Sequence, residues 1–183
     1  MQWSKLKTKM EGFISEKLKD RMQIHITAYR KFHDSPRRIW ITFDKEVIVS
    51  ASDTNYWILH EKIYEEIKFE QRLKPIPYEA DWWKMYESEE RQELVRASEE
   101  AEQSLLTANI MDSGYVYQSF LDYCSLSIDH ALHSENEFIR AFAMFDRRIG
   151  KRRLSNIDRK TLNHPLISKF YQIRCQVEKM AKR

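Results

Sequence analysis

The chain has 183 residues, of which 42% are hydrophobic and 32% charged, and its net charge is only +3. This length suits one domain of ordinary size, and we expect a single domain over residues 1–183 with a soft boundary near residues 74–80. The small net charge excludes nucleic-acid binding driven by overall charge alone, and three glycines leave no Gly-rich phosphate loop. No apolar run approaches the roughly 20 residues of a membrane span, so we expect a cytoplasmic protein without a membrane partner.

The first part of the chain predicts a helix followed by a small sheet. Apolar residues recur at helical spacing from Trp3 to Leu18, which predicts an amphipathic helix. Three segments then alternate apolar and polar residues, as strands with one buried face do: residues 22–30, 37–43 and 46–51. Asp44 and Lys45 supply the turn between the last two segments. We therefore expect a three-stranded antiparallel meander.

The remainder of the chain predicts helices separated by breaks. The first is expected to begin at Asp53 and to bury Tyr56, Trp57, His60, Ile63, Tyr64 and Ile67. Pro75 and Pro77 interrupt the chain, and Pro165 occupies the first position of the last helix. Between them, helices are expected near residues 88–108, 115–133 and 136–149, the first of them strongly acidic. The predicted fold class is α+β: an N-terminal helix, a three-stranded antiparallel meander, and a mostly helical C-terminal two-thirds.

Five segments stand out as a set: WSKLK, HITAYRKFHDSPRRIWITFDKE, the pair Tyr56–Trp57, AFAMFDRRIGKRRL and HPLISKFYQIRC. Together they span nearly the whole chain, and they resemble a family of bacterial cytoplasmic proteins of about this length. That family has no established activity, so the resemblance implies no catalytic residue, cofactor or partner. Its members often carry Gly at the position of Lys45, and Asp–Lys is a weaker turn signal than Asp–Gly.

The histidines predict no catalytic residue, no metal site and no cofactor. His60 falls on the apolar stripe of its helix, where a core histidine bonded to a neighbour is expected. His130 and His133 are three residues apart but lack a second ligand pair such as HExxH, so no metal is assigned to them. A distant alternative is an enzyme that uses His25 and His33 on the polar, aromatic face of the sheet.

The two cysteines add no nucleophile with a visible base. Cys124 falls on the inward side of its helix, and Cys175 falls roughly opposite the apolar stripe of the last helix. They form neither a CxxC pair nor a disulfide framework. Whether the chain is an enzyme stays open, and a non-enzymatic protein is favoured.

The segment FAMFDRRIGKRRL, residues 142–154, places five cations within seven positions. On a helical wheel this region puts cationic residues opposite an apolar stripe, and the helix is expected to end at Gly150. The candidate binding residues on this basic surface are Arg140, Met144, Arg147, Arg148, Lys151, Arg152 and Arg153.

Three interpretations of the basic surface are open. It pairs with the acidic helix at residues 88–108 of the same chain, it docks a partner protein, or it binds the phosphates of a nucleic acid. A homodimer held by opposite charges is a further option. We favour a non-enzymatic protein-binding module, such as an immunity- or antitoxin-like partner of another bacterial protein, because Arg is enriched in interface hot spots. The alternative is a nucleic-acid-binding accessory protein.

Overall fold

The chain forms two compact units. The structure, a computed structural model, describes residues 2–28 and 36–180. Unit 1 consists of residues 1–53 and 111–183, and unit 2 consists of residues 54–110, an insertion into the sequence of unit 1. Residues 74–80, the expected soft boundary, lie inside unit 2. The expectation of a single domain stays a prediction.

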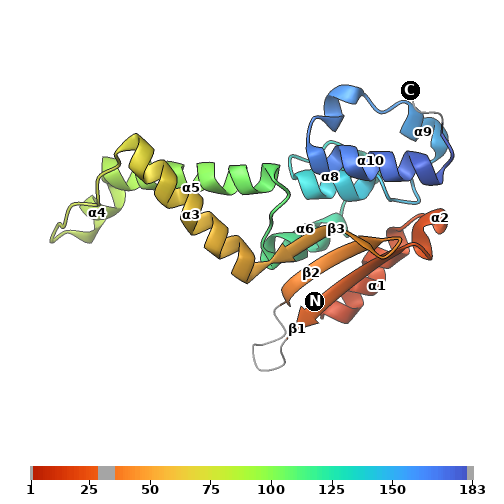
Figure 1. Ribbon diagram of the computed structural model, residues 1–183, viewed down its shortest axis with the longest axis horizontal. Coiled ribbons are helices and arrows are strands. Elements are labelled where there is room, and N and C mark those ends of the chain that lie inside the picture. Colours follow the sequence, from red (N-terminus) through yellow and green to blue (C-terminus); the bar gives the residue numbers. More distant parts are fainter. Residues whose placement is uncertain (1, 29–35, 181–183) are drawn as a thin grey trace. The chain divides into compact units, whose positions relative to one another are not determined.

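Unit 1 contains the predicted antiparallel meander (Figure 1). Its strands are β1 (Met22–Ala28), β2 (Pro36–Phe43) and β3 (Glu46–Ser52), paired in the order β1-β2-β3. Ile24 lies opposite Ile41 on the buried face, and His25 lies opposite Trp40 on the other face. The expected strands and their alternation are confirmed within the described residues. Residues 29 and 30, the expected end of the first strand, lie outside the described residues.

The turn between β2 and β3 uses two left-handed residues. Asp44 has φ 49° and Lys45 has φ 71°, as in a two-residue hairpin turn that favours glycine. Arg21 bonds the Asp44 carboxylate through Nε at 2.8 Å and also through Nη2. These hydrogen bonds lower the pKa of Asp44 and raise the pKa of Arg21. The predicted turn is confirmed, although Lys45 carries a Cβ where the family pattern often has Gly.

Lys45→Gly is expected to raise the free energy of unfolding by about 1 kcal/mol, because glycine adopts positive φ without the steric cost of a Cβ. Urea unfolding measures the change. Lys45→Ala is the matched control: it also removes the charge but keeps the Cβ, so we expect no gain. An equal gain in both variants would show that the lysine charge, and not the backbone, is unfavourable.

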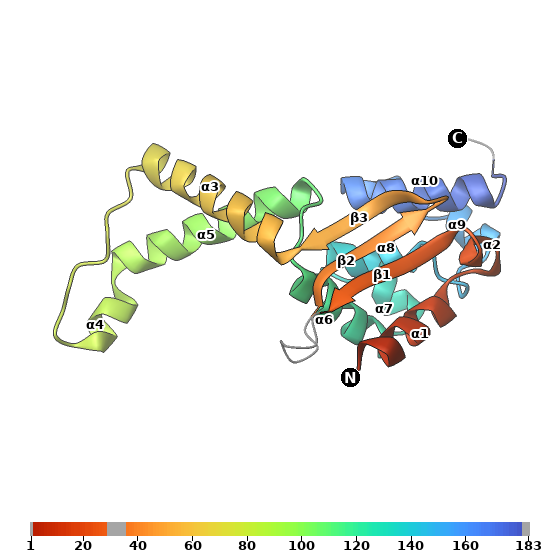
Figure 2. The same ribbon diagram turned by 60° about the horizontal axis from the view of Figure 1, so that its bottom comes forward.

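The helices of unit 1 pack against the sheet and against one another. They are α1 (Trp3–Phe13), α2 (Glu16–Lys19), α6 (Ser113–Tyr123), α7 (Ile128–Leu132), α8 (Glu137–Ala143), α9 (Lys151–Ser155), the 3-10 helix η2 (Arg159–Leu162) and α10 (Pro165–Val177). α6 contacts β2 and β3, and α1 contacts β1. α8 and α10 run side by side in both views (Figures 1 and 2). Pro165 begins α10 as predicted, where its missing N–H costs no hydrogen bond.

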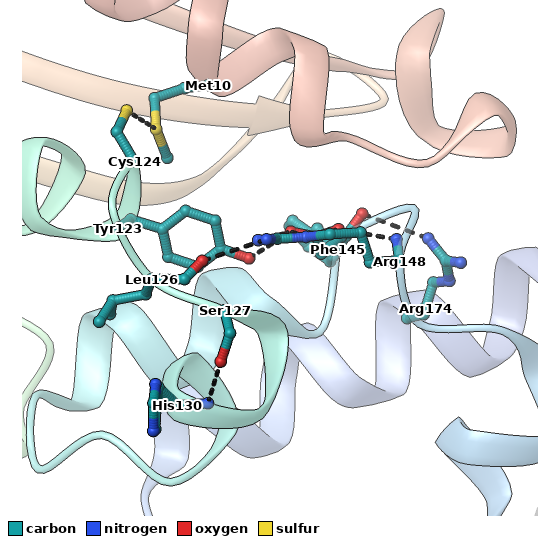
Figure 3. A network of polar contacts seen from close by, with 10 residues as sticks. Met10, Tyr123, Cys124, Leu126, Ser127, His130, Phe145, Arg148 and Arg174 are labelled. Atoms are coloured by element: carbon teal, nitrogen blue, oxygen red, sulfur yellow. Dashed lines mark hydrogen bonds and ion pairs between the residues drawn. The ribbon is translucent and has the colours of Figure 1, made fainter.

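Two helices expected to be continuous are interrupted. The helix expected from Trp3 to Leu18 is wrong as one element, because Ile14 and Ser15 are extended and separate α1 from α2. The helix expected over residues 115–133 ends at Tyr123. Ser127 is extended, and its hydroxyl accepts from the backbone N–H of His130 to begin α7 (Figure 3).

The core of unit 1 is rich in aromatic rings. Phe120 packs edge-on against Phe138 and Phe142, with ring centroids 5.3 and 5.5 Å apart. Phe145 and Phe170 stack with centroids 4.3 Å apart, which joins α10 to the segment that follows α8. All five rings are buried, and burying a phenylalanine is worth about 1.5–3 kcal/mol. The helices of unit 1 are therefore held mainly by packing.

Unit 2 is a pair of long helices joined through a short one. They are α3 (Asp53–Gln71), α4 (Trp82–Glu87) and α5 (Glu89–Thr107). The buried core between α3 and α5 is small and includes Ile67, Ala97 and Ala101. His60 is buried and bonds Ser98, with Nε2 3.3 Å from its carbonyl oxygen, so the predicted core histidine is confirmed. Trp57 was expected in the buried stripe, and this is wrong: it lies at the edge of the stripe and is 61% exposed.

Candidate functional site

The basic segment, residues 140–153, is not one face of a helix. α8 ends at Ala143, residues 144–150 form turns, and α9 begins at Lys151 with Gly150 as its N-cap. The expected helix to about residue 149, and with it the wheel that aligned Arg147 and Lys151, is therefore wrong. We call residues 144–150 the DRR turn, after Asp146, Arg147 and Arg148 at its centre.

The DRR turn is bonded to the extended link between α1 and α2. The Arg147 N–H donates to the Phe13 carbonyl at 2.7 Å, and the Ser15 N–H donates to the Phe145 carbonyl at 2.9 Å. Asp146 and Ile14 form an antiparallel bridge between these two bonds. The same pairing explains why the expected N-terminal helix is interrupted at Ile14. The extended backbone there forms hydrogen bonds with the Arg147 N–H and the Phe145 carbonyl of the turn.

A buried carboxylate lies at the centre of this turn. Asp146 is fully buried and accepts from the Tyr123 hydroxyl at 2.5 Å and from the Arg148 backbone N–H at 2.7 Å. The Arg148 guanidinium also bonds both carboxylate oxygens, at 3.0 Å from Nε and 2.7 Å from Nη2. Burial and the Asp146 charge raise the pKa of Tyr123, and the Asp146 bonds raise the pKa of Arg148. At neutral pH the cluster holds a neutral phenol and a charged guanidinium.

Arg148 is therefore a structural residue. Its Nη1 donates to the Leu126 carbonyl at 3.1 Å, and its guanidinium lies 4.7 Å from the Phe13 ring centroid. Figure 3 shows this side chain beside the Tyr123 ring and the Leu126 carbonyl. From the opposite side Arg174, which is buried, donates to the Phe145 and Ile149 carbonyls at 3.3 and 3.0 Å (Figure 3). Arg148, whose side chain is 32% exposed, and the buried Arg174 thus hold the DRR turn from two sides.

The other predicted binding residues have separate surroundings. Met144 is 2% exposed and offers no surface contact, which corrects its place on the basic surface; it packs inward where α8 ends. Arg140 is half-buried and lies 3.5 Å from Glu137, and Arg153 pairs with Asp129. Lys151 is exposed and its Nζ lies 3.9 Å from Glu178.

Arg147 and Arg152 are exposed, and no ion pair to either is found within residues 2–28 and 36–180. Within the described residues the basic segment forms four ion pairs, and all four are in unit 1. Of the predicted set, Arg147, Arg148, Lys151 and Arg152 are exposed, and Arg148 among them is bonded to Asp146 and to the Leu126 carbonyl. Pairing of this segment with the acidic helix in unit 2 stays a prediction.

The polar face of the sheet holds part of the histidine pair considered above. The His25 ring stacks on Trp40 with centroids 4.9 Å apart and bonds the Thr42 hydroxyl at 3.0 Å. Burial lowers the pKa of His25, with a further contribution from the charge of Lys7. His33 lies outside the described residues. His25 is thus held in place by a ring and a hydroxyl of the neighbouring strand.

No metal site is found in the part of the chain that the structure describes: no three of its His, Cys, Asp and Glu side chains are grouped to hold an ion. His133 lies at the end of α7, and its Nδ1 lies 2.9 Å from the carbonyl oxygen of Asp129. Among the same residues, no helix combines the length and apolar character needed to cross a membrane.

Both thiols are expected to alkylate more slowly than free cysteine near pH 8. Burial raises the pKa of Cys124, whose Sγ lies 3.9 Å from the Met10 sulfur (Figure 3), and burial also raises the pKa of Cys175. The thiolate is the reactive form, so a raised pKa lowers the reactive fraction. Timed iodoacetamide labelling with mass spectrometry measures each rate, and urea should remove the difference. A thiol that reacts faster than free cysteine would indicate an activated nucleophile.

The largest exposed apolar groups lie in unit 2 and were not predicted as a site. Among the described residues, ten large hydrophobic side chains are exposed, and nine of them lie in unit 2: Trp57, Ile58, Phe69, Ile76, Tyr78, Trp82, Trp83, Tyr86 and Val95. A soluble domain normally scatters such residues singly, and clustering marks a contact surface. α4 has no buried residue at all.

Three rings of α4 form an aromatic cluster, defined here as Trp82, Trp83 and Tyr86. The Trp82 ring lies 4.9 Å from Trp83 and 5.1 Å from Tyr86, measured between centroids. Asp81 caps the helix by accepting from the Trp83 N–H at 3.0 Å, which fixes where the rings begin. The three rings are 59, 63 and 44% exposed. The sequence signal is the concentration of three large rings, Trp82, Trp83 and Tyr86, in a helix of six residues.

One cation of unit 2 already lies on the aromatic cluster. The Arg91 guanidinium is 3.9 Å from the Tyr86 ring centroid, and its Nη1 donates to the Tyr86 carbonyl at 3.4 Å. No cation of the described residues is found over Trp82 or Trp83. The neighbouring residues are mostly acidic: Glu79, Asp81, Glu87, Glu89 and Glu90. The cluster is thus an exposed aromatic surface in an acidic setting.

The fold and these surfaces define an α+β protein with a small antiparallel sheet, helices packed on it, and an inserted helical unit with exposed aromatic rings. A family model, that of the SF0329 protein family, matches residues 2–175. The chain belongs to this family. Searches of curated proteins and of solved structures found no match. The resemblance to a family without an established activity is confirmed.

Proposed function

We propose that this chain is a non-enzymatic protein-binding module and that it contacts its partner through the aromatic cluster of unit 2. The observation that carries the proposal is the concentration of nine exposed large hydrophobic side chains in a unit of 57 residues, 54–110. Exposed tryptophan and tyrosine are the residue types that dominate binding energy at protein interfaces. Leaving them in water is unfavourable, and a partner that covers them removes that cost.

The basic segment contributes less to this proposal than the sequence predicted. Arg148 and Arg174 are used to hold the DRR turn, and Met144 is buried. Docking through Arg147, Lys151 and Arg152 stays a prediction, and these three exposed side chains offer charge without an apolar centre. Stable interfaces combine an apolar centre with a polar rim, and the aromatic cluster supplies such a centre.

A capture experiment tests the proposal. The tagged chain and its Trp82→Ala/Trp83→Ala variant are used as baits in nuclease-treated extracts of the source cells, and retained proteins are compared by quantitative mass spectrometry. The proposal predicts a protein held near one-to-one by the unaltered bait and lost from the variant. Trp57→Ala is the control bait, because Trp57 is as exposed as Trp82 and Trp83 but lies in the first turns of α3, outside the aromatic cluster. Equal retention by all three baits would contradict the proposal.

A second candidate is nucleic-acid binding by unit 1. Unit 2 contains seven Lys and Arg against thirteen Asp and Glu, a net charge of −6; unit 1 contains the other 24 cationic and 15 acidic residues, a net charge of +9. A basic unit with exposed Arg147 and Arg152 supports phosphate contact. Anisotropy of labelled DNA and RNA at rising salt tests it. Steeply salt-dependent binding, lost in Arg147→Glu/Arg152→Glu, would support this candidate.

A further inference from the structure

We infer that the partner segment that covers the aromatic cluster is a basic stretch of protein whose arginines stack on Trp82 and Trp83. This inference rests on the proposed function and names the chemistry of the partner. It is drawn from three features of unit 2: its own arginine on a ring of the cluster, the two neighbouring rings without a cation, and the acidic side chains around them.

Arg91 provides the template for the contact. Its guanidinium lies 3.9 Å from the Tyr86 centroid, well within the distance at which a cation is attracted to a ring face. Tryptophan binds cations more strongly than tyrosine does, yet Trp82 and Trp83 have no cation over them among the described residues. Tyr86 stacks on one face of Trp82, but the two tryptophans are 59 and 63% exposed, so each offers ring surface to an arginine from outside.

The negative charge of unit 2 favours a partner segment of positive charge. Its net charge of −6, with Glu87 at the end of α4 and Glu89 and Glu90 at the start of α5, repels nucleic acid and other acidic surfaces. Unit 2 of a second copy carries the same charge, so pairing of two such units is also opposed. A basic segment gains from both the acidic side chains and the aromatic faces, and arginine satisfies both with one planar group.

A peptide selection tests the inference. Short random peptides displayed on phage are selected on the full chain, and peptides that also bind the Trp82→Ala/Trp83→Ala variant are removed. The remaining peptides are expected to be enriched in arginine and to carry net positive charge. For a selected peptide, the double variant should bind at least about a hundredfold more weakly, since each hot-spot tryptophan contributes about tenfold or more.

Two sets of substitutions separate the contribution of arginine stacking from the contribution of charge. Replacing the arginines of the peptide by lysine keeps its charge and should weaken binding severalfold, because lysine stacks less well on a ring. Glu87→Gln/Glu89→Gln/Glu90→Gln keeps the shape of unit 2 and should also weaken binding severalfold at low salt, with the difference shrinking as salt rises. Glu99→Gln/Glu100→Gln/Glu102→Gln, later on α5, is the control.

The outcomes distinguish this inference from the proposed function. Peptides that depend on Trp82 and Trp83 but are neutral or acidic would overturn the basic-partner inference and leave the protein-binding proposal intact. If no selected peptide depends on these tryptophans, the basic-partner inference is contradicted, and the capture experiment decides separately on the proposed function. A concentration-dependent dimer in light scattering that dissociates in the Trp82→Ala/Trp83→Ala variant but persists in Arg147→Glu/Arg152→Glu would show that a second copy covers the cluster without these arginines, and it would overturn the inference.

Discussion

Replacing Asp146 with alanine is expected to lower the free energy of unfolding by about 2–4 kcal/mol, because each buried donor left without an acceptor costs about 1–3 kcal/mol. The change leaves the Tyr123 hydroxyl, the Arg148 backbone N–H and the Arg148 guanidinium without their shared acceptor. It also loosens the DRR turn, which pairs with Phe13 and Ser15. Urea unfolding followed by circular dichroism measures the loss.

Asp129→Ala is the control for the Asp146 prediction. Asp129 also pairs with an arginine of the basic segment, Arg153, but its side chain is 71% exposed. Exposed pairs are worth about 0–1 kcal/mol, so this variant should unfold almost like the unaltered chain. Equal small losses in both variants would show that the buried cluster does not hold the turn.

The Trp82→Ala/Trp83→Ala variant is expected to lose at least about a hundredfold in partner affinity while its unfolding midpoint stays nearly unchanged. The two rings lie on a helix with no buried residue, so their removal leaves no cavity in a core. At an interface, by contrast, each buried tryptophan typically contributes about 2 kcal/mol or more. Calorimetric titration of the captured partner and thermal unfolding of the variant measure the two quantities.

Trp57→Ala is the matched control for the Trp82→Ala/Trp83→Ala prediction. It removes a tryptophan of equal exposure from the same unit, so any general effect of losing exposed aromatic surface appears in it too. We expect its partner affinity to change less than about threefold, as for residues outside a hot spot. If Trp57→Ala weakens binding as much as the double variant does, the contact surface is not the aromatic cluster.

The elements that depend on local pattern could be predicted from the sequence. The strands alternate apolar and polar residues, and β2 and β3 are joined by the expected turn at Asp44–Lys45. The acidic helix α5 and the Pro165 start of α10 also follow local signals. Each of these signals lies within a few residues of the structure it specifies, which is why periodicity and turn chemistry suffice.

The breaks within helices could not be predicted in the same way. The extended residues at Ile14 and Ser15 are paired with residues 145–147, more than 100 positions away in the sequence. The apolar spacing continues through these breaks, so a helical wheel extends α8 past its end and aligns arginines that have separate roles. Arg148 and Arg147 are neighbours in sequence and both are exposed, yet Arg148 bonds a buried carboxylate and Arg147 has no ion pair among the described residues.

The aromatic cluster could not be predicted from apolar periodicity, because periodicity does not distinguish a buried ring from an exposed one. Trp57 fits the apolar stripe of α3 and is nevertheless 61% exposed, and Trp82 and Trp83 follow the interruption at Pro75 and Pro77, where periodicity predicts no surface. A helix pair with a core of small residues such as Ala97 and Ala101 has little room to bury several tryptophans. Residues 54–110 therefore contain more large aromatic side chains than the small core of unit 2 can bury.

Photo-crosslinking in living cells tests the central claim most directly. p-Benzoylphenylalanine replaces Tyr78, an exposed ring four residues before Trp82, and in a control it replaces the exposed Val47 of β3 in unit 1. The account predicts a discrete protein adduct from position 78 that disappears when Trp82→Ala/Trp83→Ala is added, and no such adduct from position 47. No protein adduct at position 78, or the same adducts from both positions, would contradict a partner surface at the aromatic cluster.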